Sequence, residues 1–209
     1  MIARALIRDR DGTSAVEFAL VLPLLLLFIF GMIDAGRFLW ECNQAEKATQ
    51  AGARVAVVTD VIPGGMVTSQ YVGVSGLTQG DRIPASALGK ISCNSVSGTV
   101  SCGCVPPDGA PPCPSLGTAN ATAFNRVVTR MRNMKPGITA ANVLIEYRGS
   151  GLGFAGDPDP LKPQISPLVT VRLTRLQFVP LSGFMFVTLP MPDFLTTLTA
   201  EDSSGTQSN

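Results

Sequence analysis

The sequence predicts an α+β fold: a long N-terminal transmembrane helix, then a C-terminal domain with an antiparallel sheet and one further helix. The transmembrane helix is predicted by an uncharged apolar run at residues 18–33. The sheet is predicted by apolar residues that alternate with polar ones at 142–148 and 168–178. The chain has 209 residues, which is enough for one globular domain in addition to this helix.

The apolar run is long enough to cross a membrane only if it includes Glu17. Residues 13–33 hold this single charge and would span about 32 Å as a helix, whereas residues 18–33 alone would span about 24 Å. The positive-inside rule places the N-terminus in the cytoplasm, because three arginines precede the run: Arg4, Arg8 and Arg10. A cleaved secretory signal is disfavoured, because helix-like sequence continues past Ile33 without a small-x-small site.

The predicted helix continues beyond the membrane and covers residues 13–60 in all. Residues recur there at steps of three and four, which indicates one buried stripe: Phe38, Cys42, Ala45, Thr49, Gly52 and Ala56. Gly52 lowers helix stability, so its place on the stripe indicates close packing against another element. We expect the helix to end before the Pro-Gly-Gly at residues 63–65.

A short basic leader, residues 1–12, precedes the helix. Gly12 ends this leader, Glu17 stands five positions beyond it, and the aromatic Phe18 comes next. Prepilin peptidases recognise this pattern. Cleavage after Gly12 would make Thr13 the new N-terminus and would leave the apolar run on the mature protein.

Four segments carry a resemblance to a known family: residues 10–20 (RDGTSAVEFAL), 22–23 (LP), 30–37 (FGMIDAGR) and 51–54 (AGAR). They are similar to the TadE-like family, the pseudopilins or minor pilins of the tight-adherence (Flp, type IVb-like) pilus system. The last segment departs from the family at Ala51, where an acidic residue is usual. The resemblance covers residues 8–56 well and the remainder only loosely.

The resemblance implies a pilin-like fold, with the long helix packed on the sheet, and a role in assembly, priming or tip formation of a Flp-type pilus used in cell adhesion. It implies a prepilin peptidase as processing enzyme and other pilins or pseudopilins as partners. On this basis we expect a single-pass inner-membrane protein with a periplasmic C-terminal domain, incorporated into a surface pilus. Asp34, Gly36 and Arg37 form the motif that follows the membrane.

Two residues within the apolar helix are candidates for a role in assembly. A carboxylate in lipid costs about 2.5–3.5 kcal/mol on insertion scales, so Glu17 should have a partner. The freed amine of Thr13, its own or a neighbour's, is the natural candidate, and in pilins this pairing is thought to set subunit register; alternatively, headgroups solvate Glu17 at the interface. Pro23 removes one backbone hydrogen bond and marks either a static kink or, as in pilins, a stretch that unwinds in the filament.

Four of the five cysteines fall in a Gly/Ser/Pro-rich stretch: Cys93, Cys102, Cys104 and Cys113. In an exported domain they predict one or two disulfides, with free thiols or a metal as alternatives. Cys102 and Cys104 are too close to pair comfortably with each other, which leaves pairings with Cys93 and Cys113. Cys42 is left over as a buried free thiol or as a bridge between subunits.

The extracytoplasmic globular domain is expected over residues 61–200. Its first part, residues 64–118, indicates loops and weak strands. A helix should then begin at a cap within 118–120 and end at the Pro-Gly of 136–137, with apolar residues at helical spacing: Phe124, Val127, Val128 and Met131.

Three strands should follow this helix, at residues 142–148, 168–178 and 184–189, with further apolar residues at 194–198. Residues 201–209 are polar, and we expect a disordered tail there.

The composition argues against several other functions. The formal net charge is +1 and no Lys/Arg-rich block exists, so nucleic-acid binding is disfavoured. The chain has no His and no common catalytic motif, so we expect no enzyme activity, metal, cofactor or small-molecule substrate. Residues 151–156 match GxGxxG, but the Asp-Pro-Asp-Pro that follows leaves no helix N-terminus for a pyrophosphate. The remaining alternative is an uncleaved single-pass membrane scaffold protein of an envelope complex.

Overall fold

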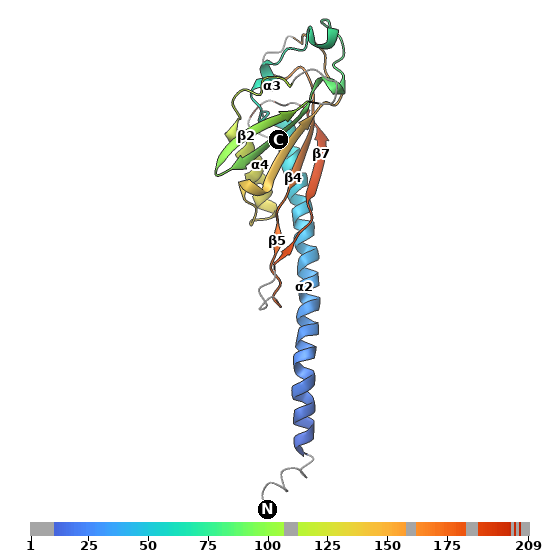
Figure 1. Cartoon of the computed structure of the whole chain (residues 1–209), viewed down its shortest axis with the longest axis vertical. Coiled ribbons are helices and arrows are strands. Elements are labelled where there is room, and N and C mark those ends of the chain that lie inside the picture. Colours follow the sequence, from blue (N-terminus) through green and yellow to red (C-terminus); the bar gives the residue numbers. More distant parts are fainter. Residues whose placement is uncertain are drawn as a thin grey trace, which may run out of the picture. The chain divides into compact units, whose positions relative to one another are not determined.

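The computed structural model describes residues 11–106, 113–157, 162–182, 188–201, 203 and 205, and of residues 11–14 it describes the backbone alone. The fold is α+β, as predicted: a long apolar N-terminal helix is followed by a domain with an antiparallel sheet and a further helix (Figure 1). The chain divides into two compact units. We call residues 1–41 with 177–190 the stem unit, and residues 42–176 with 191–209 the head unit.

The predicted N-terminal helix corresponds to α2 (Asp11–Val58), whose 48 residues include Pro23. Within the head unit the predicted stripe of α2 is buried: Ala45, Thr49, Gly52 and Ala56. The helix ends where the Thr59 hydroxyl donates a hydrogen bond to the carbonyl of Val55, at 2.8 Å. This bond satisfies one of the carbonyls that a helix end leaves without a partner.

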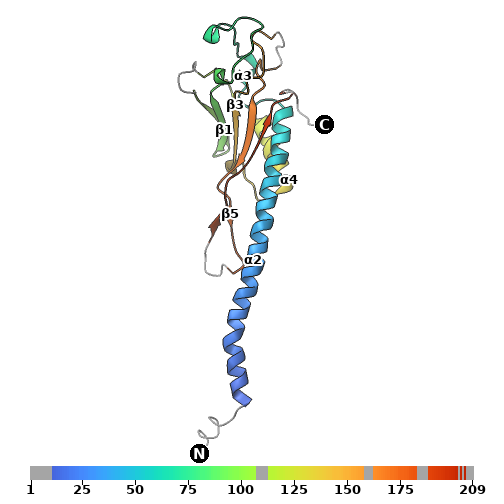
Figure 2. The ribbon, with the colours of Figure 1, turned by 90° about the vertical axis from the view of Figure 1, so that its right-hand side faces the viewer.

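The head unit is built on a five-stranded antiparallel sheet with the order β2-β1-β3-β4-β7. Its strands are β1 (Lys90–Val96), β2 (Thr99–Val105), β3 (Val143–Arg148), β4 (Leu168–Leu173) and β7 (Phe194–Thr199). Helix α4 (Ala121–Met134) and the C-terminal part of α2 lie on one face of this sheet (Figures 1 and 2). Short helices occupy the connections: α3 (Gly65–Thr68), η1 (Val74–Gly76), η2 (Ala85–Ala87) and η3 (Ala140–Asn142).

The core of the head unit lies between the sheet and these two helices. One row of inward-facing residues crosses four strands in register: Cys93, Ile145, Val171 and Thr196. The first three are buried, and the Thr196 hydroxyl lies 3.0 Å from the hydroxyl of Thr49 on α2. Because successive side chains in a strand point to opposite faces, this row identifies the face that packs on the helices.

Helix α4 begins and packs as the sequence predicts. Asn120 is its N-cap, and the side-chain oxygen accepts a hydrogen bond from the Ala123 N–H at 3.0 Å. All four apolar residues predicted to share one face are buried: Phe124, Val127, Val128 and Met131. Gly52 of α2 faces this helix, and a Cβ atom at residue 52 would come within 2.7 Å of the Met131 Cγ. Glycine therefore permits the close approach that its position on the stripe predicted.

The opposite face of the sheet holds a buried acid. Glu146 on β3 is 2% exposed and forms ion pairs with Lys90 on β1 and, at 3.6 Å, with Arg172 on β4. Arg172 pairs in turn with Asp193 at 3.8 Å. A buried carboxylate needs cationic partners, and the two strands that flank β3 supply them from both sides.

The strand predicted over 168–178 is wrong in its length, because these residues divide between two sheets. β4 ends at Leu173, and Arg175 has a φ of 57°, a left-handed conformation that interrupts a strand. The chain then forms β5 (Gln177–Phe178), which pairs with β6 (Leu189–Pro190) as a small hairpin of the stem unit. Of the strand predicted at 184–189, residues 184–187 lie outside the described residues.

One further segment is more ordered than the sequence indicated. Residues 64–118 were expected to hold loops and weak strands, yet β1 and β2 form a hairpin of two strands with 7 residues each. Of the polar tail, in which disorder was expected from residue 201, the structure describes residues 201, 203 and 205. The Glu201 N–H donates to the Val57 carbonyl at 3.0 Å, and the Gly205 N–H donates to the Asp60 carboxylate at 2.7 Å.

Gly52→Val should destabilise the head unit by about 1–3 kcal/mol, because the new side chain would overpack the contact with Met131. The expected result is a lower midpoint of thermal unfolding for the solubilised protein, followed by near-UV circular dichroism. Gly36→Ala is the matched control, since Gly36 lies on the same helix and a Cβ there would meet nothing within 4 Å. Equal midpoints for Gly52→Val and the wild type would contradict this packing argument.

Candidate functional site

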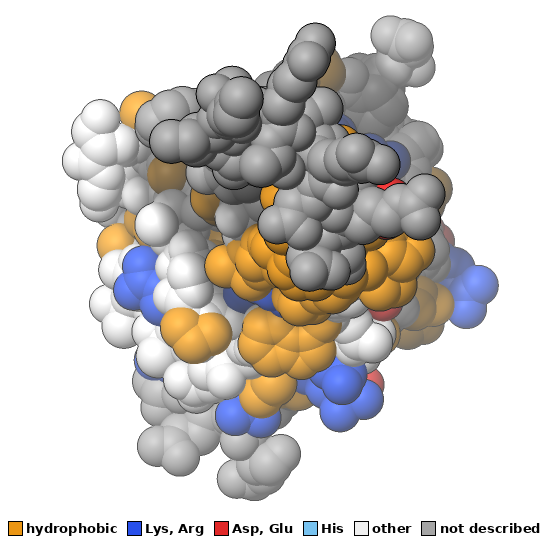
Figure 3. Space-filling view, turned by 90° about the horizontal axis from the view of Figure 1, so that it is seen from below, with side chains coloured by type: hydrophobic (Ala, Val, Ile, Leu, Met, Phe, Trp, Pro, Cys, Tyr) orange, Lys and Arg blue, Asp and Glu red, His pale blue; other side chains and the backbone are white. Residues whose placement is uncertain are grey.

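The stem unit presents an apolar helix surface that the described chain leaves uncovered. The following large apolar side chains of α2 are exposed: Val16, Phe18, Leu20, Val21, Leu24, Leu25, Leu26, Leu27, Phe28, Ile29, Phe30, Met32 and Ile33. Figure 3, a view from below, shows hydrophobic side chains gathered near its centre. Among the described residues, one helix is long and apolar enough to cross a membrane, and it begins at Ala15. The helix is therefore compatible with a single-pass membrane protein.

Two candidate assembly residues lie on this apolar surface. Glu17 is exposed between Val16 and Phe18, and it has no ion-pair or hydrogen-bond partner among the described residues. Pro23 is exposed and stands inside α2. Gly12 and Thr13, the residues of the predicted cleavage site, fall in the first turn of α2, where the structure describes only the backbone.

Asp34 begins the post-membrane motif and binds the β5–β6 hairpin. Its carboxylate accepts hydrogen bonds from the Leu181 N–H at 2.6 Å, from the Ser182 N–H at 2.8 Å and from the Ser182 hydroxyl at 2.6 Å. Asp34 is only 7% exposed. One residue beyond the uncharged run, the helix thus fastens a segment that lies almost 150 positions later in the sequence.

Arg37 lies one turn further along α2 and supports the same contact. Its guanidinium donates to the Asp34 carboxylate at 3.3 Å and to the Val179 carbonyl at 3.5 Å. It also lies 5.3 Å from the centre of the Phe178 ring, within the range of a cation–π contact. Phe38 meets the same ring edge-on, with ring centres 5.4 Å apart and planes at 82°. The motif therefore holds the hairpin by charge, hydrogen bonds and aromatic packing.

The pKa of Asp34 reflects this environment. Burial acts to raise the pKa, but the hydrogen bonds from Ser182 and Leu181 and the charge of Arg37 outweigh it and hold the pKa below the ordinary 3.8. Because the folded pKa is lowered, the carboxylate contributes stability at pH values above the unfolded pKa, and this contribution is lost as the pH falls through the folded pKa.

Gly36, the third predicted residue of the motif, makes no comparable contact. It is exposed, and a Cβ atom there would meet nothing within 4 Å. Within the described chain, packing gives no reason for glycine at this position. The structure thus brings Asp34 and Arg37 together at one contact and leaves Gly36 on the open side of the helix.

The four clustered cysteines form two disulfides, Cys93–Cys102 and Cys104–Cys113, as expected for an exported domain. The first joins directly opposed residues of β1 and β2. The second ties β2 to the segment that leads into α4. Cys42 is half-buried on α2 and forms no disulfide with a described cysteine.

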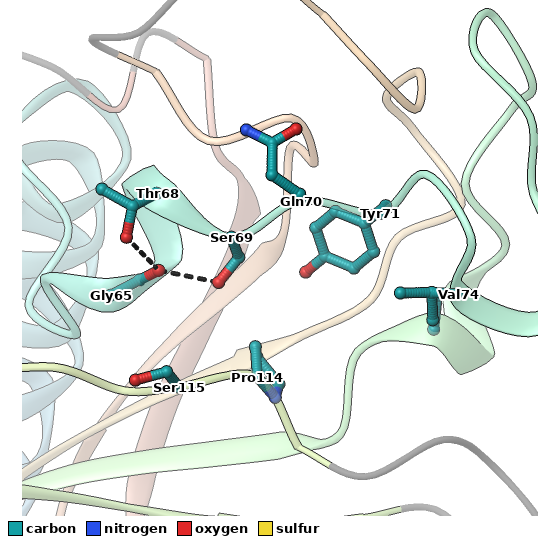
Figure 4. Close-up of a pocket in the computed structure, with 9 residues that line it drawn as sticks. Gly65, Thr68, Ser69, Gln70, Tyr71, Val74, Pro114 and Ser115 are labelled. Carbon is teal, nitrogen blue, oxygen red and sulfur yellow. Dashed lines mark hydrogen bonds between the residues drawn. The ribbon is translucent and has the colours of Figure 1, made fainter.

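The head unit also contains a small cavity of about 270 Å³ that the sequence did not indicate. Its lining is uncharged: Gly65, Thr68, Ser69, Gln70, Tyr71, Val74, Ala87, Pro114 and Ser115. Figure 4 shows the Tyr71 hydroxyl pointing toward Ser69 and Pro114, and this oxygen has no hydrogen-bond partner among the described residues. Burial raises the pKa of Tyr71 to about 12, so at neutral pH the cavity offers hydroxyls but no general base.

The described residues include no group of three or more His, Cys, Asp or Glu side chains arranged to hold a metal ion. The features that remain are the uncovered apolar helix, the unpartnered Glu17 and the hairpin bound at Asp34. All three lie in the stem unit.

Comparison with known proteins gives one match. Residues 12–54 match the model of the family described as TadE-like protein, which confirms the resemblance read from the sequence over this segment. The matched residues include Gly12, Glu17, Pro23 and the motif of residues 34–37. Neither the curated proteins nor the solved structures contain a match to the chain.

Asp34→Ala should release the hairpin, because three hydrogen bonds to Leu181 and Ser182 lose their acceptor. We expect amide hydrogen exchange in residues 177–182 of the solubilised chain to quicken by about tenfold or more. In the wild type, measured against a free peptide of the same sequence at each pH, protection should persist at pH values above about 4 and fall at lower pH.

Asp60→Ala is the matched control for Asp34→Ala. Asp60 also accepts a backbone hydrogen bond, from Gly205, but it lies in the head unit. Its loss should leave exchange in residues 177–182 unchanged. Unchanged exchange in Asp34→Ala would show that the carboxylate does not hold the hairpin.

Proposed function

We propose that this chain is a minor pilin or pseudopilin that contributes to the assembly, priming or tip of a Flp-type (tight-adherence) pilus. A prepilin peptidase cleaves it after Gly12, and residues 13–33 anchor it in the inner membrane with the N-terminus in the cytoplasm and the head unit in the periplasm. Its partners are the peptidase and other pilins or pseudopilins, with which it enters a surface pilus. It works as a structural component and not as an enzyme.

This proposal rests on the overlap between the family match and the exposed apolar part of α2. The family match covers residues 12–54, and the part of α2 that stays uncovered in the described chain lies inside the same segment. In a pilin, the same apolar helix has two successive environments. Lipid surrounds it before assembly, and neighbouring subunits surround it afterwards. A secreted monomer would have no use for it, since exposed apolar surface of this extent favours aggregation.

Glu17 supports an assembly role in addition to anchoring. It is exposed on an apolar surface without a partner among the described residues, although a carboxylate in lipid costs about 2.5–3.5 kcal/mol. Cleavage after Gly12 would create an amine at Thr13, four positions before Glu17 and therefore on the same side of the helix. That amine, from its own chain or a neighbour's, would satisfy the carboxylate and set the register of subunits.

The two disulfides are in keeping with a periplasmic head unit. Structural disulfides form and persist in oxidising compartments, whereas cytosolic thiols are kept reduced. Both bridges, Cys93–Cys102 and Cys104–Cys113, lie in the head unit. They therefore favour the same orientation in the membrane as the positive charges of the leader do, with the N-terminus in the cytoplasm and the head unit on the other side.

Gly12→Val should block processing, because the peptidase needs a small residue at the cleavage point. We expect this variant to keep its basic leader and to run as the larger form on a gel, whereas Gly36→Ala, outside the leader, should be processed normally. N-terminal sequencing of the membrane-extracted wild type should begin at Thr13. A wild-type protein that begins at Met1 would instead support an uncleaved scaffold protein of an envelope complex.

Glu17→Ala should be processed and inserted normally but should fail to support pilus assembly, because the register contact with the Thr13 amine is lost. Glu17→Gln should behave in the same way, since a neutral side chain does not replace the charge, while Glu17→Asp should retain part of the function. Glu46→Gln, an exposed acid later on the same helix, is the control. The measurements are a gel shift for processing and surface pilus counts for assembly, and normal pili from processed Glu17→Ala would reject the register role.

A further inference from the structure

The β5–β6 hairpin is an uncharged segment with exposed apolar side chains. The sequence carries no charge from Leu176 to Pro192, between Arg175 and Asp193. Among its described residues, three large apolar side chains are exposed: Val179 at 60%, Leu181 at 59% and Leu189 at 45%. Phe178, in contrast, is buried against Phe38 and Arg37. The hairpin therefore turns one aromatic side chain to the helix and leaves other apolar side chains uncovered.

The contacts with α2 place this surface at the end of the apolar helix. Phe178 contacts residues 37 and 38, while Leu181 and Ser182 bind Asp34, one helical turn closer to the N-terminus. Asp34 immediately follows Ile33, the last residue of the uncharged run. The described turn of the hairpin thus approaches the apolar segment and is fastened at the level where that segment ends.

The helix carries apolar side chains of its own just past this level. Leu39 is 68% exposed and Trp40, the single tryptophan of the chain, is 62% exposed. From Asp34 to Trp40 the helix rises about 9 Å, close to the thickness of one interfacial layer of a bilayer. Tryptophan is enriched in this layer, where its ring contacts both lipid tails and polar headgroups.

We propose that the hairpin surface formed by Val179, Leu181 and Leu189 is a second membrane contact, which enters the outer interfacial layer of the bilayer beside α2. This inference rests on the proposed anchoring by residues 13–33. Lipid is the occupant because the surface adjoins a helix of lipid-facing composition and because the hairpin sequence carries no charge between Arg175 and Asp193. Asp34 and Arg37 hold the hairpin at this depth. Asp34 accepts hydrogen bonds from the backbone N–H groups of Leu181 and Ser182, and Arg37 donates one to the Val179 carbonyl, so these polar groups have partners within the chain.

A second contact would change the mechanics of the anchor. A single helix is free to rotate about its axis and to tilt, whereas a hairpin fixed to one side of it selects one rotation. Anchors in the interfacial layer set tilt and rotation in this way. The face of α2 that meets a neighbouring subunit would then be chosen before assembly begins.

Tryptophan quenching by brominated lipids tests the depth of the hairpin directly. The full chain is reconstituted into vesicles of phosphatidylcholine that carry bromine at a shallow or at a deep position of the acyl chain. Three single-tryptophan proteins are compared in a Trp40→Phe background: Leu181→Trp in the hairpin, Phe28→Trp in the apolar helix, and Val96→Trp in the head unit. Val96 is 60% exposed, which matches the 59% of Leu181.

The expected result is strong quenching of Leu181→Trp by the shallow bromine, several-fold above that of Val96→Trp, and stronger quenching of Phe28→Trp by the deep bromine. Quenching of Leu181→Trp that equals that of Val96→Trp, while Phe28→Trp is quenched, would overturn the hairpin contact and leave the anchor in place. It would also point to a protein neighbour as the occupant. If none of the three is quenched, the anchoring helix itself is wrong. Asp34→Ala added to Leu181→Trp should abolish the shallow quenching, and persistence of that quenching would reject the role of Asp34.

Discussion

The constraint on which the rest of this structure depends is the uncovered apolar face of α2. Large side chains such as Leu20, Leu24 and Phe28 are largely exposed, and burying each of them is worth about 1.5–3 kcal/mol. The whole face therefore represents on the order of tens of kcal/mol of unrealised burial. That term exceeds the net stability of whole domains, which is about 5–15 kcal/mol. In the proposed pilin, lipid or other chains would supply the cover.

Given such a helix, the chain has to define where the apolar environment ends. In the proposed anchor Asp34 would mark this end, because it is the first charged residue after the run and its carboxylate is satisfied inside the chain by Leu181, Ser182 and Arg37. The same contact adds the hairpin to the helix at that boundary. Further along α2, beyond Trp40, the residues that face the head-unit core are mostly small, and Gly52 allows α4 to approach the helix backbone. One helix thus serves two environments through a change in side-chain size along its length.

Local sequence patterns predicted the helices. The features that the sequence did not predict depend on contacts between residues far apart in the chain. α2 and α4 follow from periodicity and from the Asn120 cap, which are properties of neighbouring residues. The β1–β2 hairpin was underestimated because its strands include Asn94 and Gly103, which are poor strand formers. The disulfide between Cys93 and Cys102 adds a covalent link that strand propensity does not predict. The partner of Asp34 was not foreseeable either, because no local signal connects it to Ser182.

Two acids of the stem unit, Asp34 and Glu17, differ in where their partners lie. The carboxylate of Asp34 accepts four hydrogen bonds within the chain, so its presence is explained by the hairpin that it fastens. Glu17 has no partner among the described residues, yet it stands in the more apolar surroundings. If lipid surrounds it, such a carboxylate needs either a cation or the headgroups of the interface to offset its desolvation. The internal contacts of the chain account for Asp34. For Glu17 we propose a partner outside the described contacts, the amine that processing would create on its own chain or on a second subunit.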